Sequence, residues 1–222
     1  MKRYLPFIII TAVALLTVGI GTILYRAKRN ASASLTPVQV SAGKPGATPP
    51  HLRGQPNAPV ALEEFGDFQC PPCAGLSHVL GQIEQDYGKR LCVIFREFPL
   101  TSHQHAREAA IAAEAAGLQG RFWEMHDLLY QNQPVWSKVA DVRPLFEAYA
   151  GIVRLNLDRF HTDTESDAVK ARLTSDGERA ASLGVTKTPT IFINSHALPS
   201  TSMTPERLRE AIDAASAGKT TF

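Results

Sequence analysis

The chain has 222 residues, of which 44% are hydrophobic and 20% are charged. This composition is typical of a globular protein and excludes an intrinsically disordered one. The formal net charge is +2, but five basic residues flank the apolar N-terminus, and without them the rest of the chain is slightly acidic. A nucleic-acid surface would need a clustered basic face, so no nucleic-acid partner is expected.

The first predicted element is an apolar helix. Residues 4–25 carry no charged side chain, and about 20 apolar residues are enough for a helix to cross a bilayer. A secretory signal has a shorter apolar stretch of about 7–15 residues. We therefore predict that residues 1–29 form a membrane anchor that contacts the lipid bilayer through residues 4–25. A signal sequence cleaved near residues 31–33 is the alternative.

The segment after the anchor has the composition of a tether. Residues 30–58 are rich in Ser, Ala, Gly and Pro, and such sequences do not bury enough apolar surface to form a core. We therefore predict a flexible linker over residues 30–58. A short strand near residues 37–40 is the alternative.

Residues 59–222 have the pattern of a single α/β domain. Residues 60–68 alternate and then bunch apolar side chains, as a strand does, and residues 91–95 form a second run rich in strand-forming residues. Between these runs, apolar residues recur at helical spacing from Pro71 to about Gly88. This order predicts a βαβ unit with two parallel strands and a right-handed crossover.

A helical block over about residues 101–183 is expected next, because helical spacing recurs there between Gly and Pro residues. The predicted helices cover residues 105–116, 121–131, 142–150, 157–162 and 166–183. Residues 190–194 return to strand character. A final helix is predicted over residues 205–215, with Thr204 as its N-cap and Pro205 at its first position.

Two of the three cysteines form the motif Cys70-Pro71-Pro72-Cys73 at the start of the first predicted helix of the domain. A helix N-terminus stabilises a thiolate, so Cys70 is predicted to be an acidic, exposed nucleophile. Cys73 is expected to resolve the mixed disulfide that Cys70 forms with a substrate. The two prolines fit a first helical turn but remove two donors to the Cys70 sulfur. We therefore expect a less strongly stabilised thiolate than in a site with His between the cysteines.

Other interpretations of the cysteines are less well supported. A structural zinc site needs four ligands, usually from two such pairs, and the sequence has no second pair, so no metal is predicted. A permanently oxidised structural disulfide is a further alternative. No cofactor is expected. Cys92 is predicted to be a small side chain of the core.

The cysteine pair lies among further motifs: GQPNAPV at residues 54–60, EFGDFQCPPC at 64–73, FREFPL at 95–100, GRFWEMH at 120–126 and LGVTKTPTIFIN at 183–194. In combination they resemble bacterial DsbA-like thiol–disulfide oxidoreductases of the thioredoxin-fold superfamily. The resemblance runs from about residue 54 to the C-terminus. It implies a thioredoxin fold, which is a central mixed β-sheet flanked by helices, with an inserted all-helical block.

The resemblance also implies roles for residues outside the cysteine pair. Thr188-Pro189 is similar to the family's cis-proline element, which faces the cysteines and leaves a backbone edge where a substrate peptide can pair as an added strand. Glu64 lies where these folds often bury an acid below the pair, where it could accept a proton from Cys73. The alternative is a solvated strand residue, and we expect one of Glu63 and Glu64 to be simply solvated.

A substrate groove is expected next to the cysteines, and its candidate residues are Phe68, Gln69, Pro71 and Pro72. Because the motif sits behind an apolar N-terminus, we expect the domain on the extracytoplasmic, periplasmic side of a bacterial cell membrane, where disulfides persist. Secretion after signal cleavage is the alternative.

The predicted activity is oxidation of thiols in substrate proteins by a Cys70–Cys73 disulfide. The resemblance implies reoxidation by a membrane partner of the DsbB or vitamin K epoxide reductase type. One alternative is a disulfide reductase in the same compartment, for example in cytochrome c maturation. Another is an anchored peptide-binding or chaperone module that does not turn over.

Overall fold

The computed structural model describes residues 43–219. The predicted anchor at residues 4–25 and the alternative strand at residues 37–40 lie outside this part of the chain. Among the helices within residues 43–219, none combines the length and the apolar character needed to cross a membrane.

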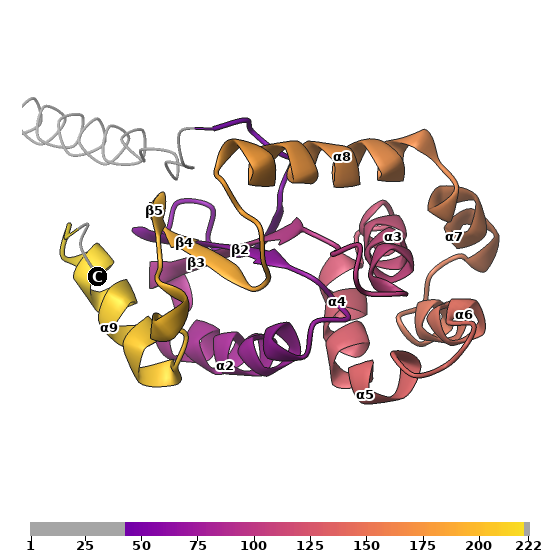
Figure 1. Ribbon diagram of the computed structural model, residues 1–222, viewed down its shortest axis with the longest axis horizontal. Coiled ribbons are helices and arrows are strands. Elements are labelled where there is room, and N and C mark those ends of the chain that lie inside the picture. Colours follow the sequence, from indigo (N-terminus) through magenta and orange to yellow (C-terminus); the bar gives the residue numbers. More distant parts are fainter. Residues whose placement is uncertain (1–42, 220–222) are drawn as a thin grey trace, which may run out of the picture. The chain divides into compact units, whose positions relative to one another are not determined.

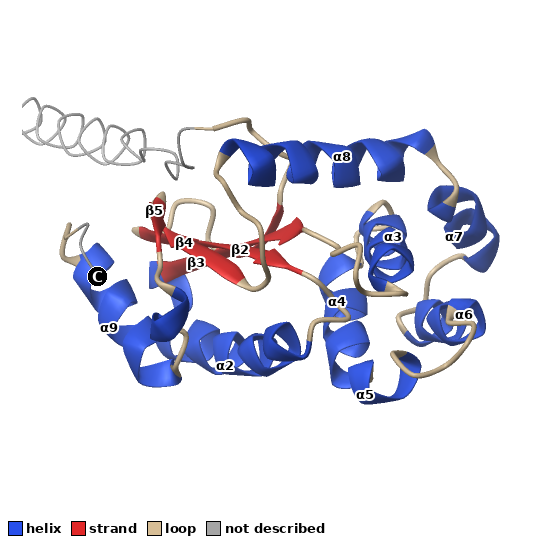
Figure 2. Ribbon diagram, viewed as in Figure 1, coloured by secondary structure: helices blue, strands red, loops and turns tan. Residues whose placement is uncertain are grey.

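Five strands form one mixed sheet (Figure 2) in the order β1-β3-β2-β4-β5. They are β1 (His51–Gly54), β2 (Val60–Gly66), β3 (Leu91–Glu97), β4 (Thr190–Ile193) and β5 (His196–Ala197). Strands β2 and β3 are parallel and are connected through α2 (Pro71–Tyr87) and the short 3-10 helix η1 (Gly88–Arg90). The predicted βαβ unit is therefore present. The other pairs, β1–β3, β2–β4 and β4–β5, are antiparallel.

Helices cover both faces of this sheet (Figure 1). Helix α2 and the C-terminal helix α9 (Pro205–Ser216) pack on one face, and α8 (Asp167–Ser182) lies over the other. All seven residues of β2 are buried, as expected for a central strand that is covered on both sides. Helix α9 begins as predicted, since the Thr204 side chain accepts a hydrogen bond from the backbone N–H of Arg207.

A block of helices lies between β3 and β4. It consists of α3 (Ala106–Gly117), α4 (Phe122–Gln131), α5 (Gln133–Trp136), α6 (Arg143–Ile152), α7 (Leu157–Thr164) and α8. Helix α3 buries seven alanines almost completely, and these small side chains let α4, α7 and α8 approach it closely. The short helix α5 was not predicted, because Pro134 suggested a break there. Its Trp136 is nevertheless fully buried in the core of this helical block.

The flexible linker predicted for residues 30–58 is wrong over the part that the structure describes. Strand β1 pairs with β3 along its whole length. Before it, the backbone carbonyls of Lys44, Pro45 and Ala47 accept hydrogen bonds from arginine side chains. The Pro and Gly content of this segment predicted no core of its own. The segment is ordered instead by contacts with residues far along the chain.

The arginines that hold residues 44–47 belong to a buried charge network. Glu63 on β2 accepts hydrogen bonds from Arg96 on β3, at 2.8 Å, and from Arg179 on α8, at 2.7 Å. Asp176 on α8 accepts from Arg96, from the Ala47 N–H and from the Glu97 N–H. These four charged side chains are no more than 5% exposed. They therefore join the sheet, α8 and the segment before β1.

Removal of one member of this network should strongly destabilise the domain. Glu63→Gln places an amide against two buried guanidinium groups, and a broken buried ion pair costs roughly 3–5 kcal/mol. We expect a loss of that size in the free energy of unfolding, measured by urea denaturation of the full-length chain. Glu178→Gln is the matched control, because it breaks the exposed pair with Lys44 and should change stability little. Equal effects of the two substitutions would contradict the role assigned to Glu63.

Candidate active site

The cysteine pair lies where β2 leads into α2. Cys70 is the N-cap of α2, and its carbonyl accepts hydrogen bonds from the N–H groups of Cys73, at 3.1 Å, and Ala74, at 3.2 Å. Pro71 and Pro72 occupy the first helical turn, where backbone N–H groups have no partner within the helix. The three cysteines are free thiols. Cys70 is only 4% exposed, less than predicted, and Cys73 is fully buried.

The two thiols titrate very differently. The pKa of Cys70 is lowered to about 6, first because the Cys73 thiol hydrogen-bonds to it, and also through the Thr188 side chain and the Cys73 backbone N–H. Burial and the charge of Asp67 oppose this effect. The pKa of Cys73 is raised, because its proton is held in the bond to Cys70 and because it is buried beside Glu64. Cys70 is therefore the thiolate, and Cys73 holds the proton.

Thr188 and Pro189 lie against Cys70, as the resemblance implied. The Thr188–Pro189 peptide bond is cis, and the Cys70 Sγ lies 3.5 Å from the Thr188 carbonyl oxygen. The Thr188 Oγ1 is buried without a hydrogen-bond partner in the thiol form. This hydroxyl is therefore free to donate to the Cys70 sulfur once that sulfur is a thiolate.

Glu64 is buried below the pair, on the face of β2 opposite to that of Glu63. It is 1% exposed, and its Oε1 has no hydrogen-bond partner. Burial raises the pKa of Glu64 to about 8, and the charges of Cys70 and Glu84 contribute in the same direction. The expectation that one of Glu63 and Glu64 is solvated is wrong. Both are buried, because two arginines pair with Glu63 and the protonated form is favoured at Glu64.

Phe68 and Gln69 are not among the residues that line the groove beside the cysteine motif. Phe68 is fully buried and packs on Phe95 and Tyr130, at ring-centroid distances of 5.3 and 4.9 Å. The Gln69 Oε1 accepts a hydrogen bond of 2.6 Å from the His105 N–H, which ties the loop before Cys70 to the helical block. The alternating pattern of β2 does not continue past Gly66. Both side chains contact the helical block.

Two further residues, which were not predicted from the sequence, fix this loop. The Asp67 carboxylate accepts hydrogen bonds from the N–H groups of Gln69 and Leu100 and pairs with His103 at 2.8 Å. Gln133, on α5, donates through its Nε2 to the carbonyls of Phe68 and Cys70. Asp67 could have been recognised from the sequence, because an Asp directly before a turn commonly bonds the backbone of that turn. No sequence pattern points to Gln133, which lies 63 positions away from Cys70.

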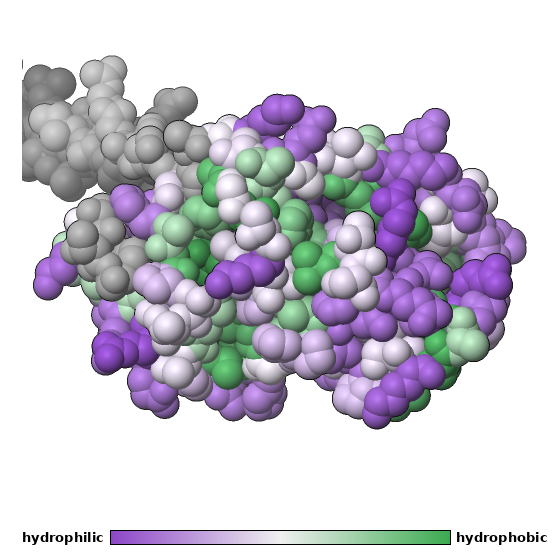
Figure 3. Space-filling model, in the orientation of Figure 1, coloured by the Kyte–Doolittle hydropathy of each residue, from purple (hydrophilic) through white to green (hydrophobic). Residues whose placement is uncertain are grey.

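A groove of about 420 Å³ lies beside the cysteine motif, with Pro72, Thr188 and Pro189 among its lining residues. It runs between α2 and the loop that precedes β4 and reaches the 3-10 helix η2 (Ser200–Ser202). Its lining residues are Pro72, Gly75, Leu76, Val79, Lys187, Thr188, Pro189, Ser200 and Met203. Of the four predicted groove residues, only Pro72 lies in this lining, while Pro71 is exposed outside it. In Figure 3, apolar side chains gather around the loop before β4, with hydrophilic surface on either side.

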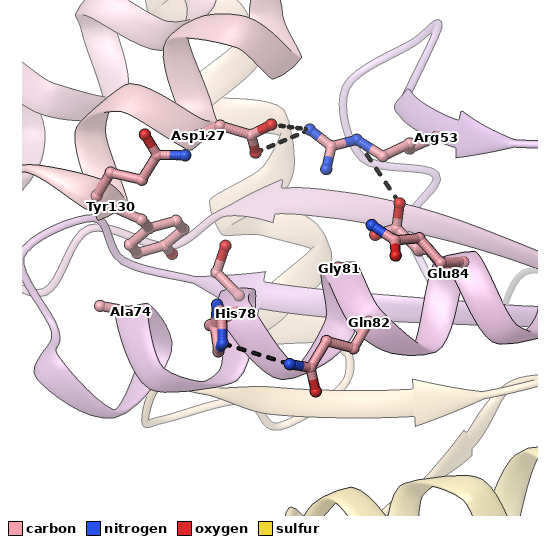
Figure 4. Close-up of a pocket in the computed structure, with 11 residues that line it drawn as sticks. Arg53, Ala74, His78, Gly81, Gln82, Glu84, Asp127 and Tyr130 are labelled. Atoms are coloured by element: carbon pink, nitrogen blue, oxygen red, sulfur yellow. Dashed lines mark hydrogen bonds and ion pairs between the residues drawn. The ribbon is translucent and has the colours of Figure 1, made fainter.

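A second groove, of about 580 Å³, lies between α2 and α4 and is lined by neither cysteine (Figure 4). Arg53 crosses it, 2.8 Å from the Asp127 carboxylate, 3.7 Å from Glu84 and over the ring of Trp123. A single guanidinium group thus faces two carboxyl groups in this groove. Cys92 is buried in a small cluster with Ala58 and Ile94, and burial raises its pKa to about 11.

Removal of the Thr188 hydroxyl should raise the pKa of Cys70. In Thr188→Val a methyl group replaces the donor, so the thiolate loses one stabilising contact. At a pH near 6 the variant should hold less thiolate and react more slowly with iodoacetamide, and the two rates should converge at alkaline pH. Thr174→Val is the control, because its hydroxyl bonds a carbonyl on exposed α8. An unchanged midpoint of the rate–pH curve in Thr188→Val would contradict this assignment.

Comparisons with known proteins agree with this geometry. The solved structures of BdbD from Bacillus subtilis and of a thioredoxin-like oxidoreductase from Silicibacter pomeroyi share the fold, with TM-scores of 0.69 and 0.64. Their sequence identities are 22% and 24%, and the alignments cover 81% and 77% of this chain and 100% and 94% of theirs. The thiol-disulfide exchange protein alpha-DsbA2 from Wolbachia pipientis has a TM-score of 0.65 at 18% identity, over 75% of this chain and 87% of its own.

Sequence relatives include Na(+)/H(+) antiporters NhaA 1 of Mycolicibacterium gilvum, 38% identical over 149 residues, and of Salinispora arenicola, 39% identical over 146 residues. Each match covers 65% of this chain but only 23% and 21% of the antiporter. A family model described as thioredoxin matches residues 47–214. The chain therefore belongs to the thioredoxin family and has the DsbA-like form of its fold, with a helical block between β3 and β4.

Proposed function

We propose that the chain is an extracytoplasmic protein thiol–disulfide oxidoreductase that oxidises thiols of substrate proteins through Cys70 and Cys73. The observation that carries this proposal is the opposite titration of the two thiols, with a low pKa for Cys70 and a raised one for Cys73. The groove that opens beside Pro189 supports it, because a substrate segment needs a surface next to the reacting sulfur.

The exchange begins with the Cys70–Cys73 disulfide. A substrate thiolate attacks the Cys70 Sγ, the bond between the two cysteines breaks, and Cys73 leaves with the electron pair. A second substrate thiolate then attacks the substrate sulfur of the mixed disulfide, and Cys70 leaves as a thiolate. The substrate loses two electrons and the pair gains them. Because a thiol of low pKa is the better leaving group, the stabilised Cys70 thiolate favours this second step.

Glu64 is proposed as the proton donor to Cys73 in the oxidising direction. Cys73 leaves as a buried thiolate, which is unfavourable until a proton reaches it. Glu64 interacts electrostatically with Cys73 and has a pKa of about 8, so it holds a proton at neutral pH and can give it up. In the reverse direction the same carboxylate would take the proton from Cys73.

The apolar N-terminus supports a proposal for the compartment, and the resemblance to DsbA-like proteins supports one for the redox partner. We propose that residues 4–25 anchor the chain in a bacterial cell membrane, with the catalytic domain on the periplasmic side. A membrane protein of the DsbB or vitamin K epoxide reductase type would then reoxidise the pair. The resemblance to antiporters does not transfer ion transport to this chain, because the shared segment is less than a quarter of those proteins.

Trapping of a mixed disulfide tests the exchange reaction. Cys73→Ser removes the resolving thiol, so the Cys70 thiolate should attack a disulfide of an oxidised substrate protein and release one substrate sulfur as a thiolate. The resulting covalent adduct should accumulate and disappear on reduction. Cys70→Ser should form no such adduct. Cys92→Ala is the control and should behave as the parent, since Cys92 packs away from the pair. Adducts that persist in Cys70→Ser would argue against this chemistry.

The direction of electron flow is tested by equilibrating the full-length chain with glutathione buffers. Since the pKa of Cys70 is lowered to about 6, the reduced form is stabilised, and we expect equal thiol and disulfide in buffers more oxidising than those that balance thioredoxin. An equilibrium near that of thioredoxin would favour the reductase alternative. Full cellular function with both cysteines replaced by serine would favour the chaperone alternative.

A further inference from the structure

The groove beside the cysteines has an apolar wall and one charged side chain. Leu76 and Val79 on α2 and Met203 after η2 supply the wall, and Lys187 is the only charged residue among the lining residues. Its ammonium group donates to the Ser200 Oγ at 3.2 Å. Lys187 therefore extends from the loop before β4 to η2, on the opposite side of the groove.

This ammonium group has no acidic partner. Within residues 43–219 no carboxylate forms an ion pair with Lys187, whose hydrogen bond goes to a neutral hydroxyl. The acid that acts on Cys70 in this region, Asp67, has a fully buried side chain and is already satisfied by two backbone N–H groups and His103. The charge of Lys187 is thus available to a bound segment, and exchange of its hydroxyl partner for a carboxylate would strengthen the contact.

Lys187 is also close to the reacting sulfur along the chain. It directly precedes Thr188, whose carbonyl oxygen lies 3.5 Å from the Cys70 Sγ. A residue in an extended segment advances by about 3.3 Å. A carboxylate that meets the ammonium group would therefore belong to a residue about two positions from the substrate cysteine, while an apolar neighbour rests on Leu76, Val79 and Met203.

We propose that Lys187 makes the groove selective for substrate segments that carry Asp or Glu about two residues from the reacting cysteine, together with an apolar residue. This inference rests on the proposed function, because it names the substrates of the same site. The attraction acts between partly solvated charges, so it should weaken as ionic strength rises.

The test compares matched peptides in the full-length chain carrying Cys73→Ser. Each peptide holds one cysteine as a disulfide with a coloured thiol of low pKa, an apolar residue, and Asp, Asn or Lys two positions away. The Cys70 thiolate attacks the peptide sulfur, the peptide becomes bound to Cys70, and the coloured thiolate is released with the electron pair. The second-order rate constant of this release is measured at low and high salt.

We expect the Asp peptide to react about 2- to 5-fold faster than the Asn peptide at low salt, in the range of an exposed ion pair. The Lys peptide should be the slowest, and the differences should shrink at high salt. Lys187→Ala should remove the preference and Lys187→Glu should reverse it. Lys89→Glu is the matched control, because it makes the same charge change on exposed η1, at the other end of α2, and should leave the preference intact.

The outcomes separate this inference from the proposed function. No colour release above that of a Cys70→Ser, Cys73→Ser double variant would overturn both. Release that depends on Cys70 but has the same peptide ratios in the parent and in Lys187→Glu would overturn the selectivity alone. A shift of equal size in Lys89→Glu would also overturn it, because net charge and not the groove would then set the preference.

Discussion

The pairing of Glu63 with Arg96 and Arg179 is the contact on which the arrangement of this domain depends. It joins the central strand, its parallel neighbour and α8, and the same arginines hold the backbone of residues 44–47. Buried charges are costly unless every partner is in place, so the position of α8 over the sheet is tightly specified. The loop that leaves α8 carries Thr188 and Pro189 to Cys70. A charge network remote from the cysteines thereby helps to place half of the site.

Two adjacent glutamates show how one strand supports both stability and chemistry. Glu63 and Glu64 are almost equally buried, at 3% and 1% exposure, but they point to opposite faces of β2. Two guanidinium groups meet Glu63, so its charge is compensated. None meets Glu64, so its carboxyl group favours the protonated form, with a pKa of about 8. The presence or absence of arginines beside the carboxyl group, and not burial alone, decides which acid can exchange a proton.

Features of the fold that depend on neighbouring residues could be predicted from the sequence, and features that depend on distant contacts could not. The βαβ unit, the cysteine pair at a helix start and the Thr204 N-cap depend on neighbouring residues, and they were predicted. The order in residues 44–47 and the burial of Glu63 depend on arginines 33 to 135 positions away, and β1 depends on its pairing with β3. Phe68 was predicted to line the groove but is buried, because the alternation of side chains along β2 ends at Gly66. The cis bond at Pro189 was predicted only through family resemblance, since no local pattern distinguishes it from a trans bond.

The two sides of Cys70 differ in a way that limits where selectivity can arise. On the side of the helical block, Gln133 and Gln69 bind backbone groups of the loop and of α3, and the aromatic core around Phe68 is closed. Reorganisation there would break buried hydrogen bonds. On the other side, every residue that lines the groove except the buried Leu76 is exposed or partly exposed, so most of these side chains can change partners at little cost. We therefore assign the proposed recognition of substrates to the groove, where Lys187 is the single charge in the lining.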